Sequence, residues 1–283
     1  MNPPMEGFYD RGLAARLARG AAAAYGAERD IQAWAQAQEC AACEVVRDER
    51  ADTLAFVAAA GETGFVIFRG TRDLRNWITD LDCRRVEFSL QPSAFSLSGA
   101  EVHEGFSRAL RNVWADLSGA LKQMAPGCRN VFFAGHSLGG ALAMLAAAGF
   151  QCGAQGTERP TVWVYTFGQP RVGNGVWAAW YDRQLGRRSF RVVHAEDVVA
   201  RVPWLLGRYR HCGTEVFYDT AGVCHLDRKW WEKALSDAAG LCREWKHGAI
   251  ALLGDHHVGT YVQILNADNF AAVLDRRCMA NGI

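Results

Sequence analysis

Residues 131–143 read VFFAGHSLGGALA and contain the most informative pattern of the chain. The first residues are apolar and partly aromatic, as in a buried strand, and an alanine-rich segment typical of a helix follows Ser137. Ser137 lies between Gly135 and Gly139, which gives the pattern G-x-S-x-G. The order strand, sharp turn, helix, with a hydroxyl at the turn, predicts that Ser137 is a nucleophile on a strained elbow.

The two glycines fit this interpretation because the backbone of such a turn packs tightly against its neighbours. Side chains at Gly135 and Gly139 would meet the adjoining strand and helix. The alternative is that Ser137 only caps a helix that follows a glycine turn. The pattern therefore predicts a serine nucleophile, which needs partner residues from elsewhere in the chain.

The bulk composition is that of an ordinary globular protein. The chain has 283 residues, of which 50% are hydrophobic and 22% are charged. Its net charge of +1, without a basic block, argues against nucleic acid as the main partner. No apolar run approaches the length of a transmembrane helix, and no linker or internal repeat is evident, so we expect one domain over residues 1–283.

The cysteines and the first residues suggest where the protein works. Nine cysteines are scattered along the chain, and the pair Cys40 and Cys43 has no second pair to complete a zinc site. Free thiols in a reducing compartment are the simpler expectation. Residues 1–20 carry several charges and no apolar signal core. We therefore expect a cytoplasmic protein, or one exported by a route that needs no signal peptide.

Short apolar runs alternate with helical patterns through the middle of the chain. This alternation predicts an α/β fold, with helices packed on a largely parallel sheet. The expected strands are 43–46, 54–58, 65–68, 131–135, 161–167, 190–194 and 215–218, the last near a sheet edge. The expected helices are 12–26, 105–124, the one after Ser137, 175–184, 226–247 and 258–274.

A serine nucleophile needs a base, and that base needs an orienting carboxylate. Where the serine follows a strand in this way, the acid and then the histidine come later in the chain. Asp197 follows the expected strand 190–194, with Glu196 as its neighbouring competitor. His256 and His257 lie in a glycine-bracketed loop before the last helix, and both remain candidates for the base.

Several further segments resemble the class 3 lipases, the family that includes the triacylglycerol lipases of filamentous fungi. The similar stretches occur in the family's order, from about Thr53 to Asp219 and again near Asp255. They are FRGT at 68–71, LRNWITD at 74–80, VHEGF at 102–106, TFGQPRVG at 166–173 and the stretch from Asp197 to Pro203. The resemblance implies an α/β-hydrolase fold, in which a mostly parallel sheet is flanked by helices.

The resemblance also implies a role for each site residue. Ser137 is expected to be the nucleophile, Asp197 the acid and His256 the base, because His256 follows an aspartate as the family's histidine does. Thr71 and the backbone N–H of Leu138 are expected to form the oxyanion hole.

Residues 72–82 are the lid candidate. Leu74, Trp77, Ile78 and Leu81 fall on one face of a short helix directly after Thr71. A core-facing helix is the alternative. Residues 224–247 do not match the fungal pattern and are interpreted as a helical insertion.

These features together predict a serine carboxylic-ester hydrolase that acts on acylglycerols through an acyl-enzyme on Ser137. No cofactor and no metal are expected, and the substrate is a lipid or ester, which the enzyme would meet at a lipid–water interface. A phospholipase A1-type enzyme and a short-chain or aryl esterase on the same fold are alternatives. A non-catalytic lipid-binding or effector module is an alternative of another class.

Overall fold

The computed structural model describes residues 5–72, 83–90, 98–153, 159–194, 197–203, 208–226 and 256–266. Four of the sequence-based predictions fall wholly or mostly outside these ranges. They concern the lid residues Leu74, Trp77, Ile78 and Leu81, the competitor Glu196, the insertion beyond Leu226 and the end of the last helix.

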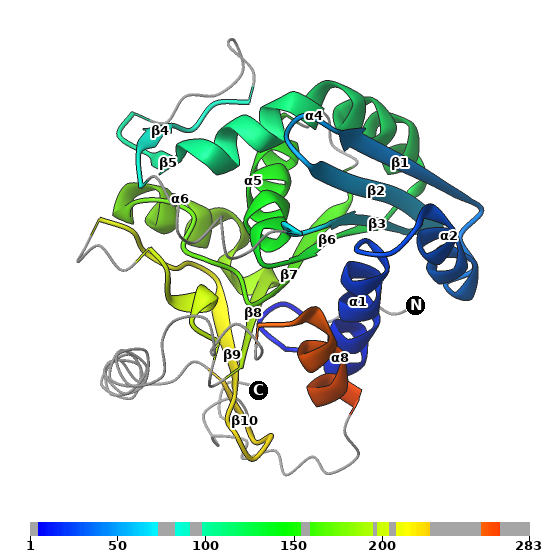
Figure 1. The fold of residues 1–283 in the computed structure, drawn as a ribbon. Helices are drawn as coiled ribbons and strands as arrows, with labels where there is room; N and C mark the ends of the chain where they lie inside the picture. Colours follow the sequence, from blue (N-terminus) through cyan, green and yellow to red (C-terminus); the bar gives the residue numbers. More distant parts are fainter. Residues whose placement is uncertain are drawn as a thin grey trace.

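A twisted sheet forms the centre of the described structure (Figure 1). Its strand order is β1-β2-β3-β6-β7-β8-β9-β10. The strands are β1 (Ala42–Asp48), β2 (Thr53–Ala60), β3 (Thr63–Phe68), β6 (Asn130–His136), β7 (Thr161–Phe167), β8 (Ser189–His194), β9 (Thr214–Tyr218) and β10 (Cys224–Leu226). A separate pair is formed by β4 (Arg85–Glu87) and β5 (Glu101–His103).

The middle of the sheet is parallel and its margins are antiparallel. Strands β3, β6, β7, β8 and β9 pair in parallel, whereas β1, β2 and β10 join them in antiparallel fashion. Every residue of β6 is buried, because helices cover both faces of the sheet there. The expected α/β sandwich with a mostly parallel sheet is therefore confirmed.

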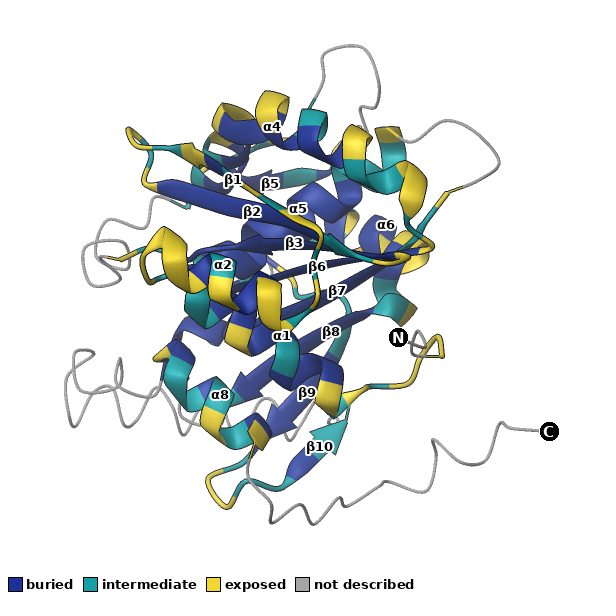
Figure 2. Cartoon of the chain, turned by 90° about the vertical axis from the view of Figure 1, so that its right-hand side faces the viewer, coloured by how far each residue is buried: buried dark blue, intermediate teal, exposed yellow. Residues whose placement is uncertain are grey.

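Helices cover both faces of the sheet (Figures 1 and 2). One face carries α1 (Arg11–Ala23), α2 (Glu28–Ala37) and α8 (Val258–Asn266), with α1 packed against α8. The other carries α4 (Glu104–Met124), α5 (Leu138–Gly153) and α6 (Gly175–Leu185). Three short 3₁₀ turns occupy Ala125–Gly127, Gly186–Arg188 and Val199–Arg201.

The structure differs from the expectations at residues 224–226, and its described part contains one helix and two strands that were not expected, namely α2, β4 and β5. Residues 224–226 were expected to open a helical insertion, but they form strand β10, because Cys224–Leu226 pairs with β9 along its free edge. The helix α2 was not expected. Its buried residues Ile31, Trp34 and Ala35 have helical spacing, but they span little more than one turn, which is too short to give a clear pattern.

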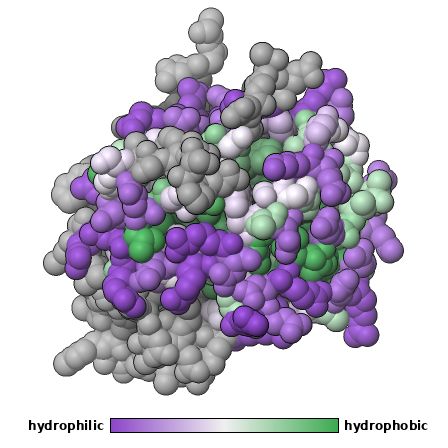
Figure 3. All heavy atoms as spheres, turned by 90° about the horizontal axis from the view of Figure 1, so that it is seen from above, coloured by the Kyte–Doolittle hydropathy of each residue, from purple (hydrophilic) through white to green (hydrophobic). Residues whose placement is uncertain are grey.

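The molecular surface is mixed in polarity. Seen from above, hydrophilic side chains surround small areas of hydrophobic ones (Figure 3). In the described part of the chain, no helix has both the length and the apolar character needed to cross a membrane.

Candidate active site

Ser137 occupies the sharp turn between β6 and α5. Its φ of +58° lies in the left-handed region, which costs a non-glycine residue about 1–3 kcal/mol and is therefore held by its surroundings. The Ser137 N–H donates to the carbonyl of Phe167, and the Ser137 carbonyl accepts from the N–H of Gly140. The turn is thus tied to β7 on one side and to α5 on the other.

The flanking glycines are required by close packing of the backbone. A Cβ atom at Gly135 would lie 2.8 Å from the amide nitrogen of Gly140, and one at Gly139 would lie 2.5 Å from the carbonyl oxygen of Phe68. Both distances are too short for non-bonded atoms, and backbone cannot swing aside as a side chain can. The G-x-S-x-G pattern is therefore a steric requirement of this turn.

Asp197 lies at the carboxyl end of β8 and is fully buried. Its Oδ1 accepts hydrogen bonds from the N–H groups of Val199 at 2.8 Å and Ala200 at 3.3 Å. These donors belong to the 3₁₀ turn that follows, whose first N–H groups have no partners within the turn itself. The local chain thus supplies two donors to one carboxylate oxygen.

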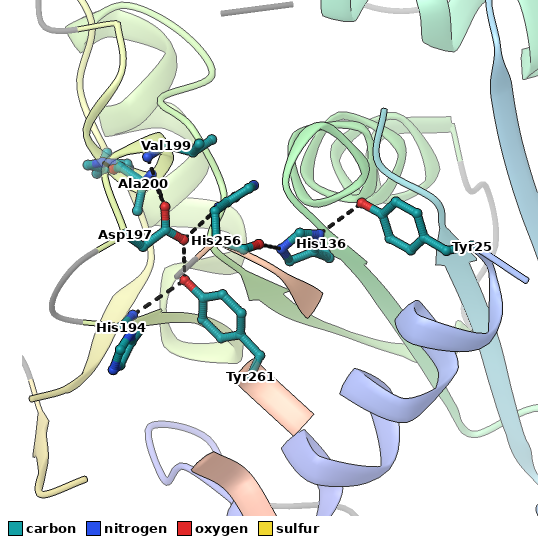
Figure 4. A network of polar contacts seen from close by, with 9 residues as sticks. Tyr25, His136, His194, Asp197, Val199, Ala200, His256 and Tyr261 are labelled. Carbon is teal, nitrogen blue, oxygen red and sulfur yellow. Dashed lines mark hydrogen bonds and ion pairs between the residues drawn. The ribbon is translucent and has the colours of Figure 1, made fainter. Parts of the chain in front are cut away.

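His256 meets the other oxygen of the same carboxylate. Its Nδ1 lies 2.7 Å from Asp197 Oδ2, and the His256 side chain is only 2% exposed (Figure 4). A carboxylate only accepts, so Nδ1 carries the proton and Nε2 presents its lone pair. Both His256 Nε2 and Ser137 Oγ are buried without a hydrogen-bond partner. An acceptor and a hydroxyl are therefore both available for a reacting molecule.

Tyr261 completes the surroundings of the carboxylate. Its hydroxyl donates to Asp197 Oδ2 and accepts from the N–H of His194 at 3.3 Å. Tyr261 lies on α8, little more than one helical turn beyond His256. Four donors thus converge on the buried Asp197 carboxylate, so both of its oxygens are hydrogen-bonded.

Gly168 leaves room for the pair formed by Asp197 and His256. Its φ is +58°, and a Cβ atom there would lie 2.8 Å from His256 Cε1 and would also overlap the Asp197 carboxylate. The space that a larger residue would fill is occupied by the two side chains themselves. Position 168 therefore requires glycine for two reasons: its positive φ and the space that the Asp197 and His256 side chains occupy.

The segment after β3 runs beside Ser137. A Cβ atom at Gly70 would lie 3.1 Å from Ser137 Cβ, so the main chain passes directly by the serine. Arg69, 6% exposed, anchors this segment by donating to the carbonyl of Asp52 at 2.8 Å and pairing with its carboxylate. Thr71, half-buried, follows at once, and Leu138 is the first residue of α5.

The two candidate histidines occupy different environments. His257 is exposed, and its Nδ1 accepts from the N–H of Gly259 at 3.0 Å, in the first turn of α8. His256 is buried against Asp197. The structure thus brings Asp197 and His256 together and places His257 at the surface. Among the described residues, no group of three or more His, Cys, Asp or Glu side chains could hold a metal ion.

Sequence reasoning did not find Gly168 or Tyr261. Tyr261 had a weak signal, since it lies only five residues after the candidate His256, in the expected last helix. Gly168 had none of its own, because its constraint comes from side chains distant in the chain. Both became visible only when the sheet brought the loops after β7 and β8 together.

Comparison with known proteins places the chain among the lipases. The family described as Lipase (class 3) matches residues 65–206. The chain is 34% identical over 156 residues to the secreted mono- and diacylglycerol lipase 1 of Fusarium solani, a match that covers 54% of this chain and 43% of that protein. The chain spans about half the length, or less, of the curated relatives it matches.

Solved lipase structures share the fold. A deletion mutant of the Rhizomucor miehei lipase propeptide complex superposes with a TM-score of 0.62 at 28% identity, over 75% of this chain and 67% of that one. A triacylglycerol lipase with a serine protease triad as its catalytic centre gives a TM-score of 0.57 at 27% identity, over 74% and 78% of the two chains. The expected α/β-hydrolase fold is thereby confirmed.

The predicted location is wrong. We expected a cytoplasmic protein or export by a signal-independent route, but the similar Fusarium enzyme is by name a secreted lipase, which points to export. Charged residues near the start of the chain were a poor guide, because location depends on more than the segment considered. The family, in contrast, follows directly from the match over half the sequence and from the shared fold. The chain belongs to the class 3 lipase family.

Proposed function

We propose that this protein is a serine carboxylic-ester hydrolase that hydrolyses acylglycerols. The observation that carries the proposal is the buried pair of Asp197 and His256, with His256 Nε2 and Ser137 Oγ both left without a partner. Buried polar atoms normally find partners, so two unpartnered atoms of this kind beside the Asp197 carboxylate and the elbow are candidates for contact with a reacting molecule. Membership of the lipase family supports an ester as the substrate.

In the first step Ser137 Oγ attacks the carbonyl carbon of the ester. As the new C–O bond forms, the proton of Ser137 passes to His256 Nε2, and an electron pair of the C=O bond moves to its oxygen. Asp197 stabilises the resulting imidazolium and keeps its ring oriented. Four hydrogen-bond donors hold Asp197 in place, so the acid need not reorganise during the step.

The negative charge on the former carbonyl oxygen needs fixed donors. The backbone N–H of Leu138, at the start of α5, and the N–H and hydroxyl of Thr71 are the proposed oxyanion donors. Removing one such donor from an enzyme typically costs about 3 kcal/mol of barrier. The close approach of Gly70 to Ser137 supports this role, because it puts the next residue beside the reacting centre.

The intermediate collapses when its C–O bond to the alcohol breaks. His256 Nε2 gives its proton to the leaving alkoxide oxygen, and the acyl group stays on Ser137. Water then attacks the acyl-enzyme while His256 takes its proton. The carboxylic acid leaves and Ser137 regains its hydrogen. The atoms and charges balance without a cofactor.

Replacing Ser137 with Ala is expected to abolish hydrolysis of a soluble p-nitrophenyl ester and labelling by a fluorophosphonate probe. The small change of side chain at a buried turn should leave the circular dichroism spectrum and the melting temperature close to those of the wild type. Turnover retained by the variant would contradict the mechanism. A wild-type protein that neither labels nor turns over would instead support a non-catalytic lipid-binding module.

A chain-length series of esters, measured below and above their solubility limits, tests the substrate class. A lipase is expected to show a rate increase when emulsified acylglycerol appears, because its substrate is then presented at an interface. Plain saturation with short esters would indicate an esterase. Preference for a diacyl phospholipid over a triacylglycerol would indicate a phospholipase A1-type enzyme.

A further inference from the structure

His136, the residue before the nucleophile, joins two elements that are distant in the chain. Its Nε2 lies 2.7 Å from the carbonyl oxygen of His256, and its Nδ1 lies 2.8 Å from the hydroxyl of Tyr25 at the end of α1 (Figure 4). His136 is 3% exposed, so water does not compete for these bonds. The residue therefore links the N-terminal helix to the backbone of the proposed base.

The two contacts determine where the protons lie. A carbonyl oxygen only accepts, so His136 Nε2 carries the proton and donates to His256. Nδ1 is then an acceptor, and the hydroxyl of Tyr25 donates to it. The main chain of Gly70 donates in turn to the Tyr25 oxygen. The result is a directed series of hydrogen bonds from the proposed oxyanion segment to the loop of the base.

The chemistry of the surroundings maintains these proton positions. The pKa of His136 lies well below its usual 6.5, mainly because the ring is buried and secondly because His256 is nearby. The ring is therefore neutral. Burial also raises the pKa of Tyr25, so its hydroxyl keeps the proton that it donates. A charged His136 would carry a hydrogen on Nδ1 and would lose the acceptor that Tyr25 needs.

Packing reinforces the link between His136 and the base. The ring centroids of His136 and His256 lie 4.5 Å apart, and the Tyr25 ring meets the His136 ring edge-on at 5.8 Å. The carbonyl oxygen of His136 would lie 2.6 Å from a Cβ atom at Gly70, so the oxyanion segment fits closely on the same residue. His136 thus touches all three parts of the proposed site.

From this arrangement we propose that His136 and Tyr25 are positioning residues, which hold the main chain of His256 at a fixed place relative to Ser137. The connection is short. His136 is covalently bonded to Ser137, and its ring donates directly to the main-chain carbonyl of His256. A displacement of about 1 Å between reacting groups can cost roughly 100-fold in rate. The proposal rests on the proposed function and adds to it how base and nucleophile keep their separation.

Replacing His136 with Gln or with Asn separates positioning from simple filling of space. The amide nitrogen of Gln reaches about as far as Nε2 and can still donate to the His256 carbonyl, whereas that of Asn reaches only the place of Nδ1. We expect His136→Gln to keep kcat within about threefold of the wild type. We expect His136→Asn to lower kcat roughly tenfold or more, with KM unchanged.

Replacing Tyr25 with Phe tests the other end of the series. The variant keeps the ring and removes the hydroxyl, so His136 Nδ1 loses its donor. We expect kcat to fall by roughly two- to threefold at constant KM, because the donor to the His256 carbonyl remains. Tyr181→Phe is the matched control, since its buried hydroxyl bonds Ser189 at 3.0 Å, at the start of β8 and away from the site. That variant should lose similar stability and keep wild-type kcat.

The measurements are kcat and KM on a soluble ester, the rate of fluorophosphonate labelling and the melting temperature. Equal losses in His136→Gln and His136→Asn, or wild-type kcat in His136→Asn, would overturn the proposal. So would a loss in Tyr181→Phe that matches the loss in Tyr25→Phe. If the wild type itself does not hydrolyse the ester, or Ser137→Ala does, the proposed function has failed, which is a separate outcome.

Discussion

At the scale of single residues, two kinds of backbone constraint surround the site. Ser137 adopts a positive φ although it carries a side chain, and Gly168 adopts one where a side chain would meet His256. The first stores strain at the proposed nucleophile, and the second preserves space for the proposed base. Under the proposed function, both constraints position these groups before a substrate arrives.

Gly168→Ala is expected to reduce kcat by about 100-fold, because the added methyl group would displace His256 and Asp197. Kinetics on a soluble ester, together with thermal unfolding, measure the effect. Gly61→Ala is the matched control: its φ of +55° is nearly the same, but no atom lies within 4 Å of the added Cβ. It should show the backbone strain alone, with normal kcat. Similar kcat losses in the two variants would contradict the steric explanation.

At the scale of elements, the site depends on how the loop after β3 is anchored. Arg69 is buried, and it donates to the main chain and pairs with the side chain of Asp52 in the turn before β2. The antiparallel pairing of β2 and β3 brings that turn beside the loop. The turn before β2, near the edge of the sheet, therefore holds in place the proposed oxyanion segment that follows β3.

Asp52→Asn is expected to destabilise the protein by about 1 kcal/mol, since it leaves the Arg69 cation without its countercharge but keeps the shape of the turn. It should also lower kcat, because the segment before Thr71 is less firmly held. Chemical denaturation and ester kinetics report the two effects. The control is Glu62→Gln, which removes a pair with Arg129 whose partners are 60% and 77% exposed and which should change little. Equal destabilisation in both variants would contradict this role for Asp52.

At the scale of the whole molecule, the site unites segments from both ends of the described chain. Tyr25 comes from the turn that follows α1, Ser137 from the middle of the sheet and His256 from the loop before α8. Helices α1 and α8 pack together on one face (Figure 1), so their contact helps to fix the site. Overall stability and site geometry are thus coupled through His136.

This coupling predicts a pH dependence of folding stability. His136 stays neutral in the folded state, beside Tyr25, His256 and His257, but takes up a proton near pH 6.5 when unfolded. Because the unfolded state binds more protons, the free energy of unfolding falls as pH decreases, by roughly 1 kcal/mol between pH 7 and pH 5.5 from this residue. His136→Gln should show a correspondingly shallower loss in denaturation at the two pH values. Identical pH profiles would contradict the assignment.

The sequence alone determined most of the fold. Apolar runs such as 161–167 became strands because buried parallel strands need continuous hydrophobicity, and the spacing in 105–124 gave α4 because one helix face must meet the core. The elbow at Ser137 was also predictable. Its glycines meet a local steric requirement, and such a requirement can be recognised in a short stretch of sequence.

The tertiary structure decided which distant side chains meet. The sequence favoured His256 over His257 only through a family resemblance, whereas the fold buries His256 against Asp197 and exposes His257. Tyr25 reads in the sequence as the end of an ordinary packing helix, and only the contact between α1 and the elbow gives it a hydrogen bond to His136. A local sequence pattern reflects the secondary structure of its own segment. A contact between distant loops depends instead on the register of the whole sheet.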